Sequence, residues 1–71
     1  MAIFTLYGAR ANAGFSQKKA AELLGISNKT LSNWENGVSI PNIQQVEAIC
    51  KLYGRKLDEI NFLPRNPLKA N

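Results

Sequence analysis

The sequence predicts a single all-α domain built from five short helices. The chain has 71 residues, enough for one small hydrophobic core and too few for a second domain. Apolar residues recur at the three- and four-residue spacing of helices, and no alternating strand pattern of useful length is present. Glycines, prolines and helix-capping residues divide the chain into five segments, which sets the expected helix count.

The first helix is expected over residues 3–12. Leu6 and Arg10 lie one helical turn apart in this segment, and Gly14 follows as a residue that readily adopts the left-handed conformation that ends helices. Gly8, inside the segment, weakens the helix by about 1 kcal/mol relative to alanine.

The second and third helices are expected over residues 17–24 and 28–36. Ser16 and Ser27 each supply a hydroxyl that can cap a helix N-terminus, and Gly25 begins the connection between the two helices. Two helices joined by a three-residue turn that starts with glycine form a helix-turn-helix pattern.

The remaining residues predict two further helices and a tail. The fourth helix is expected to begin after the N-cap residue Asn42 and to stop at Gly54. The fifth is expected over residues 57–62, with two carboxylates in its first turn, where they complement the helix dipole. Two prolines follow, so residues 1–63 are expected to form the domain and residues 64–71 a C-terminal tail.

The composition favours a binding protein over an enzyme. The formal net charge is +4, which favours polyanionic partners. The chain has no histidine, so Cys/His zinc sites and hydrolases that pair serine with a histidine base are excluded. The five carboxylates form no close acid and base pair, and no glycine-rich phosphate loop is present. We therefore expect no catalytic residues, no metal and no cofactor.

The sequence predicts a cytoplasmic protein without a membrane span. Its longest charge-free stretches contain polar residues and fall short of the ~20 apolar residues that a span needs, and residues 1–13 lack the basic start of a signal peptide. Cys50 is the only cysteine, which excludes an internal disulfide. Its place in an apolar run predicts a small core residue, and the alternative is a reactive or intermolecular thiol.

The segment "GISNKTLSNWENG", residues 25–37, has an unusual polar face. Helical spacing places Leu31 and Trp34 on an apolar side. The opposite side carries short amides and hydroxyls, which are poor helix formers and uncommon on solvent-facing helices. Trp34 is expected to lie in the core and not to act as a stacking platform. Glu35 lies at the edge of the apolar side, where a carboxylate needs a partner, and the alternative is a solvated Glu35.

The chain resembles the helix-turn-helix domains of the phage repressor and Cro type, the XRE family. The resemblance runs through "FSQKKAAELLGISNKTLSNWENG", continues in "NIQQVEAICKLYG" and reaches "LDEINFL", so that it covers residues 6–63. It implies a compact five-helix, lambda-repressor-like fold. One departure is Ala20, where such domains usually carry a larger aliphatic residue. The resemblance also implies an ion pair between Arg10 and Glu35, since similar domains pair an arginine and a glutamate at these places.

In this class of fold the second helix of the motif lies in the DNA major groove, where short polar side chains can reach base edges. The resemblance thus implies base reading by Asn28, Lys29, Ser32 and Asn33. Contacts to the DNA backbone are expected from Ser16, Gln17, Lys18, Thr30, Asn36 and Ser39. The alternative for the polar face is a solvated surface with local caps, and the alternative for the lysines is solubility.

The sequence is therefore interpreted as a sequence-specific, double-stranded DNA-binding transcriptional regulator, acting as a homodimer on a palindromic operator. One recognition helix reads too few base pairs to select a genomic site, and apolar residues cluster near the C-terminus. The candidate dimer contacts are Leu57, Ile60, Phe62 and Leu63. The dimer could form only on DNA, and in the alternative Phe62 and Leu63 seal the monomer core. The rival function is a protein-interaction module, such as an antitoxin that binds a toxin; a small enzyme is the third reading.

Overall fold

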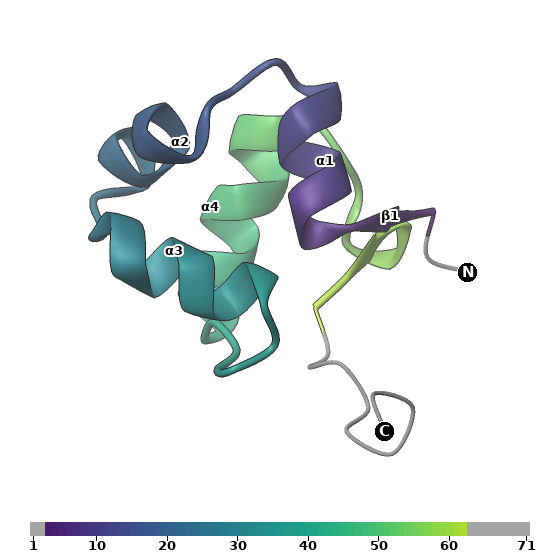
Figure 1. Cartoon of the computed structure of the whole chain (residues 1–71). Helices are drawn as coiled ribbons and strands as arrows, with labels where there is room; N and C mark the ends of the chain where they lie inside the picture. The colour runs from purple at the N-terminus through teal and green to yellow at the C-terminus, as the bar shows by residue number, and fades with distance from the viewer. Residues whose placement is uncertain (1–2, 63–71) are drawn as a thin grey trace.

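The computed structural model describes residues 3–62, which form four α-helices, one 3-10 turn and a pair of very short strands (Figure 1). In Figure 1, α2 and α3 lie on one side of the domain, α1 and the strands lie on the other, and α4 passes between them. Leu63 and the expected tail, residues 64–71, lie outside the described residues. The elements in chain order are β1 (Phe4–Thr5), α1 (Leu6–Asn12), α2 (Gln17–Leu24), α3 (Asn28–Glu35), α4 (Ile43–Tyr53), η1 (Leu57–Glu59) and β2 (Ile60–Asn61).

The helix count differs from the predicted five because both ends of the described chain contain extended backbone. The first helix does not begin at residue 3, since Thr5 is its N-cap: its hydroxyl accepts a hydrogen bond of 2.9 Å from the backbone N–H of Gly8. Residues 57–62 form one 3-10 turn and then a strand in place of a fifth helix. This extended backbone buries the Ile60 side chain and leaves Asn61 exposed.

β1 and β2 pair in parallel and tie the two ends of the described chain together. Phe4 lies opposite Ile60, and Thr5 lies opposite Asn61. The backbone N–H of Ile3 also donates to the carbonyl oxygen of Glu59 at 2.9 Å. Two-residue strands leave no alternation to detect in a sequence, which explains why the sequence pattern did not predict them.

The other helix boundaries follow the predicted caps. Ser16 and Ser27 accept hydrogen bonds from the third residue of α2 and α3, and Asn42 forms a reciprocal capping box with Gln45 at the start of α4. Gly25 has φ +73°, a conformation that glycine adopts without a Cβ clash, and it ends α2 where the predicted turn begins. α3 ends at Glu35, one residue earlier than predicted, because Asn36 leaves helical geometry as the C-cap residue.

The core lies where α1, α2, α3 and α4 meet. Leu31 of α3 and Ile49 of α4 are its largest fully buried side chains. Ala20 and Ala21 are also buried, and their small side chains allow α2 to approach its neighbours closely. The core side chains are Leu6, Ala9, Ala20, Ala21, Leu31, Trp34, Ile49, Tyr53 and Ile60.

Cys50 and Tyr53 lie on the side of α4 that faces the core. Cys50 is half-buried against the core, and burial raises the pKa of its thiol. Burial also raises the pKa of Tyr53, to about 12, and its buried hydroxyl has no hydrogen-bond partner among the described residues.

Within residues 3–62, no helix has the length and apolarity to cross a membrane, and no group of three or more His, Cys, Asp or Glu side chains is placed to hold a metal ion.

Candidate nucleic-acid interface

α2 and α3 form a compact helix-turn-helix unit. After the left-handed Gly25, the backbone N–H of Ile26 donates to the carbonyl oxygen of Ala21 at 3.0 Å, which closes the end of α2. The Ser27 hydroxyl then accepts from the backbone N–H of Thr30 at 3.0 Å and starts α3. Local capping therefore fixes the short turn between the helices.

α3 has one buried side and one polar side, as its spacing predicts. Leu31 is fully buried and Trp34 is 8% exposed, so Trp34 packs in the core. Asn28 and Lys29 are exposed, and Ser32 and Asn33 are half-buried. The candidate base-reading residues thus keep accessible surface on the outer side of α3, which is available to a partner.

A buried ion pair holds the end of α3 against α1. Arg10 Nε donates to Glu35 Oε2 at 2.6 Å, and Arg10 Nη2 donates to Glu35 Oε1 at 3.2 Å. Their side chains are 10% and 5% exposed. Arg10 Nη1 also donates to the carbonyl oxygen of Phe15 at 2.9 Å, and its guanidinium lies 5.0 Å from the centre of the Tyr7 ring. The hydrogen bond to Glu35 raises the pKa of Arg10 above its ordinary value, so the arginine stays charged.

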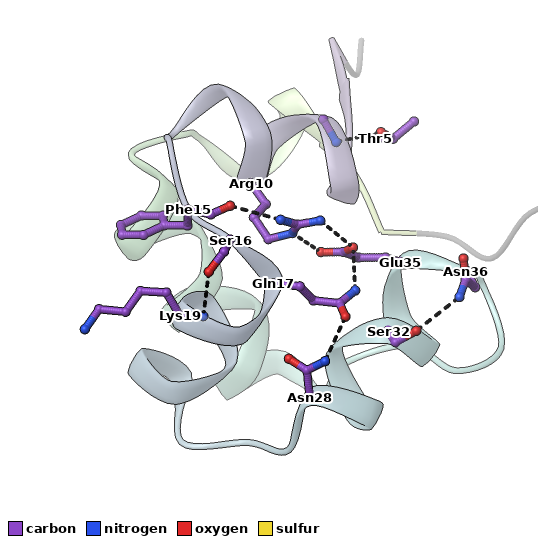
Figure 2. A network of polar contacts seen from close by, with 11 residues as sticks. Thr5, Arg10, Phe15, Ser16, Gln17, Lys19, Asn28, Ser32, Glu35 and Asn36 are labelled. Carbon is purple, nitrogen blue, oxygen red and sulfur yellow. Dashed lines mark hydrogen bonds and ion pairs between the residues drawn. The ribbon is translucent and has the colours of Figure 1, made fainter.

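The hydrogen bonds continue from this ion pair to the start of α3 (Figure 2). Gln17 Nε2 donates to Glu35 Oε1 at 3.1 Å, and Asn28 Nδ2 donates to Gln17 Oε1 at 3.0 Å. The network therefore links α1 to the first residues of α2 and to both ends of α3. Sequence reasoning missed the bonds of Gln17, and residue spacing offered no signal because the partners are 11 and 18 positions away.

The candidate backbone contacts lie around both ends of α3. Lys18 is exposed beside the start of α2, and Ser39 is exposed in the loop after α3. The Ser16 hydroxyl accepts from the backbone N–H of Lys19 at 3.0 Å, and the Thr30 hydroxyl accepts from Ser27 Oγ at 2.9 Å. The Ser16 hydroxyl thus already caps α2, and the Thr30 hydroxyl is already bonded to Ser27, the N-cap residue of α3.

Asn36, another candidate backbone contact, lies at the C-terminal end of α3. Its Nδ2 donates to Ser32 Oγ at 3.2 Å. This bond joins a candidate phosphate contact to a candidate base reader, so the two side chains are positioned together.

The four candidate dimer contacts have different environments. Leu57 is 63% exposed, whereas Ile60 is 4% exposed and packs in the core of the single chain. The prediction of a dimer contact at Ile60 is therefore wrong, because burial within its own chain leaves the side chain inaccessible. Phe62 is partly buried against the same core, and Leu63 lies outside the described residues.

A helix-turn-helix family model matches residues 6–60. The chain is 32% identical over 54 residues to an uncharacterized HTH-type transcriptional regulator, YgzD of Bacillus subtilis, a match that covers 76% of this chain and 82% of YgzD. It is 40% identical over 50 residues to the HTH-type transcriptional regulator ImmR of Bacillus subtilis, covering 70% of this chain and 39% of ImmR. It is 34% identical over 58 residues to the HTH-type transcriptional regulator PuuR of Escherichia coli, covering 82% of this chain and 31% of PuuR. The match spans most of the described fold, and the chain belongs to the helix-turn-helix family of DNA-binding transcriptional regulators.

Proposed function

We propose that the chain is a sequence-specific regulator of transcription that binds double-stranded DNA with α3 in the major groove. The observation that carries the proposal is the accessible polar side of α3, held on the core by a buried ion pair. The family match and the net charge of +4 support a DNA partner. The chain spans less than half the length of ImmR and of PuuR. Control of transcription by this protein is therefore a proposal.

The chemistry of the accessible side chains supports two separate roles on this surface, contact with bases and contact with phosphates. Lys29 can donate to guanine O6 and N7, and Asn28 or Asn33 can pair with the N6 and N7 edge of adenine. Ser32 adds a hydroxyl that can donate or accept. Lys18, in the first turn of α2, and Ser39, in the loop after α3, are suited to phosphates. The proposed cytoplasmic location follows from this function, since the chain must reach the DNA it regulates.

Selection of bound duplexes from a random pool tests the proposal. We expect enrichment of a palindromic motif whose two halves are centred one duplex turn apart, about 34 Å. Recovery of duplexes without any common motif would contradict sequence-specific binding. A second selection with Asn28, Lys29 and Asn33 all changed to alanine provides the control, because the same fold without these side chains should enrich no motif.

We further propose that the chain binds its operator as a homodimer through the outer side of α4 and the adjoining Leu57. This face exposes Ile43 and Leu57, at 74% and 63%, and both side chains line the same shallow hollow beside α4. Glu47 and Lys51 lie one turn apart on the same face. In an antiparallel arrangement, Glu47 of each copy can face Lys51 of the other, so the surface is complementary to itself.

The dimer supplies the second recognition helix that a genomic site requires. DNA holds both copies close together, so a weak contact on α4 suffices through raised effective concentration. A partner protein, as in the antitoxin alternative, would use the same apolar face. Sedimentation of the chain with and without a palindromic duplex distinguishes the two, because two copies on one duplex support the homodimer and a single bound copy contradicts it.

A further inference from the structure

Tyr7 is an exposed aromatic residue beside the C-terminal end of the recognition helix. It lies in the first turn of α1, its side chain is 58% exposed, and the start of α1 lies next to the end of α3 (Figure 1). We propose that the Tyr7 hydroxyl binds a phosphate of the DNA backbone at this end of α3. The inference rests on the proposed function, and it extends the DNA-binding surface from α2 and α3 onto α1.

The Tyr7 ring is held in place although it is exposed. The guanidinium carbon of Arg10 lies 5.0 Å from the centre of the ring, which is the distance of a cation–π contact. Arg10 is itself fixed by its ion pair with Glu35, whose side chain is 5% exposed. A buried ion pair therefore supports the aromatic ring, so less side-chain entropy is lost when the hydroxyl binds a partner.

The Tyr7 hydroxyl has no task in the part of the chain that the structure describes. The ring alone makes the contact with Arg10, and phenylalanine would make the same contact. Within residues 3–62 the hydroxyl forms no hydrogen bond. A phenol can donate and accept, and tyrosine is one of the side chains that donate to phosphate oxygens in protein–DNA interfaces.

Asn36 brings a second hydrogen-bond donor to the same place. Tyr7, Asn36 and Gly37 line one small hollow between α1 and the end of α3. Asn36 Nδ2 donates one N–H to Ser32 Oγ at 3.2 Å, which leaves its second N–H for another acceptor. A hydroxyl and an amide N–H on one hollow suit the anionic oxygens of a phosphate, which only accept.

The place of Tyr7 at the C-terminal end of α3 favours a phosphate over a base. In this class of fold, the N-terminal residues of the recognition helix contact the base edges. α3 has eight residues and is therefore about 12 Å long, which matches the major-groove width of about 12 Å. A side chain beyond the C-terminal end of α3 thus meets the edge of the groove, where the phosphates lie.

Tyr7→Phe tests the proposal because it removes only the hydroxyl and keeps the ring over Arg10. Fluorescence anisotropy measures its Kd on the duplex selected by the wild-type protein and on a scrambled duplex. We expect both Kd values to rise about tenfold, the loss expected for one hydrogen bond to a charged group, because every sequence presents phosphates. The salt dependence of Kd should stay that of wild type, since a phenol carries no charge and releases no counterion.

Tyr53→Phe is the matched control. The chain has two tyrosines, and Tyr53 is 5% exposed in the core, so the loss of its hydroxyl should leave both Kd values unchanged. Unchanged Kd values in Tyr7→Phe, or a loss confined to the selected duplex, would overturn the proposal.

A second experiment locates the phosphate. Neutral methylphosphonates replace the phosphates of the selected duplex one at a time, at matching positions in both half-sites. At one phosphate, wild type should lose about tenfold more affinity than Tyr7→Phe, because the hydroxyl and the phosphate oxygen are partners. If the effects of Tyr7→Phe and of every methylphosphonate are independent, Tyr7 binds no phosphate and the proposal is overturned.

The outcomes separate this proposal from the function on which it rests. If wild type selects a motif and Tyr7→Phe binds as wild type does, the contact by Tyr7 is overturned and the DNA-binding function stands. If wild type binds no duplex, both proposals fail.

Discussion

The ion pair between Arg10 and Glu35 makes a strong prediction about stability. Arg10→Met removes three hydrogen bonds and leaves the Glu35 carboxylate, 5% exposed, with the hydrogen bond from Gln17 Nε2 at 3.1 Å. Breaking a buried pair by removing one partner costs about 3 to 5 kcal/mol, because the other charge stays buried without compensation. Domains of this size are stable by only about 5 to 10 kcal/mol, so Arg10→Met should lose a large part of its free energy of unfolding.

The reverse change and the double variant complete the cycle. Glu35→Leu leaves a buried guanidinium with the Phe15 carbonyl and the Tyr7 ring, and its cost should be similar. The double variant Arg10→Met/Glu35→Leu buries no charge, so it should be more stable than either single variant. Urea unfolding followed by circular dichroism measures all three, with the slope of each transition checking that unfolding stays two-state.

The exposed pair between Lys19 and Glu22 provides the matched control. Its atoms are 3.4 Å apart, and the side chains are 58% and 69% exposed. Lys19→Met and Glu22→Leu should each change stability by less than about 1 kcal/mol, since solvent screens such pairs. Losses below about 1 kcal/mol for Arg10→Met and Glu35→Leu, adding in the double variant, would refute the reasoning, because that is how an exposed pair behaves.

Three further predictions follow from single features of the fold. Tyr53→Phe removes a buried hydroxyl without a described partner and should leave stability at neutral pH unchanged or higher. Because the folded pKa of Tyr53, about 12, exceeds the ordinary value of 10, wild-type stability should fall as pH rises above 10, and Tyr53→Phe should show a smaller fall in urea melts. Gly25→Ala should cost about 1 to 2 kcal/mol because φ is +73°, a conformation that strains a residue with a Cβ. The space around the added Cβ is open, so the whole cost comes from the backbone, and a neutral change would contradict the strain argument. Leu57→Lys should abolish two-copy binding on a palindromic duplex in sedimentation while leaving the melting temperature unchanged, and retained two-copy binding would exclude this face.

The sequence predicted those features that depend on residues close together in the chain. Serines and asparagine that cap helices, together with glycines that end them, defined α2, α3 and α4 to within one residue. The buried position of Trp34 also followed from helical spacing on one element. These signals are local, so no knowledge of the packing was needed to find them.

The features that the sequence missed depend on contacts between distant segments. The strand pair joins Phe4 to Ile60, and each strand is too short to show an alternating pattern. Ile60 was assigned to a surface because nothing local distinguishes an apolar residue that seals its own core from one that contacts a partner. In the same way, the partners of Gln17 became visible only once α1, α2 and α3 were packed together.

The most direct test of the account compares base reading with phosphate contact on α3 and α2. Fluorescence anisotropy measures the Kd of wild type, Lys29→Ala, Asn33→Ala and Lys18→Ala on the selected duplex and on a scrambled duplex, across a range of salt concentrations. We predict that Lys29→Ala and Asn33→Ala weaken binding to the selected duplex by about 1 to 3 kcal/mol and reduce its advantage over the scrambled one. Lys18→Ala should weaken both duplexes equally and reduce the salt dependence. Equal losses on both duplexes in all three variants would contradict the claim that α3 reads the DNA sequence.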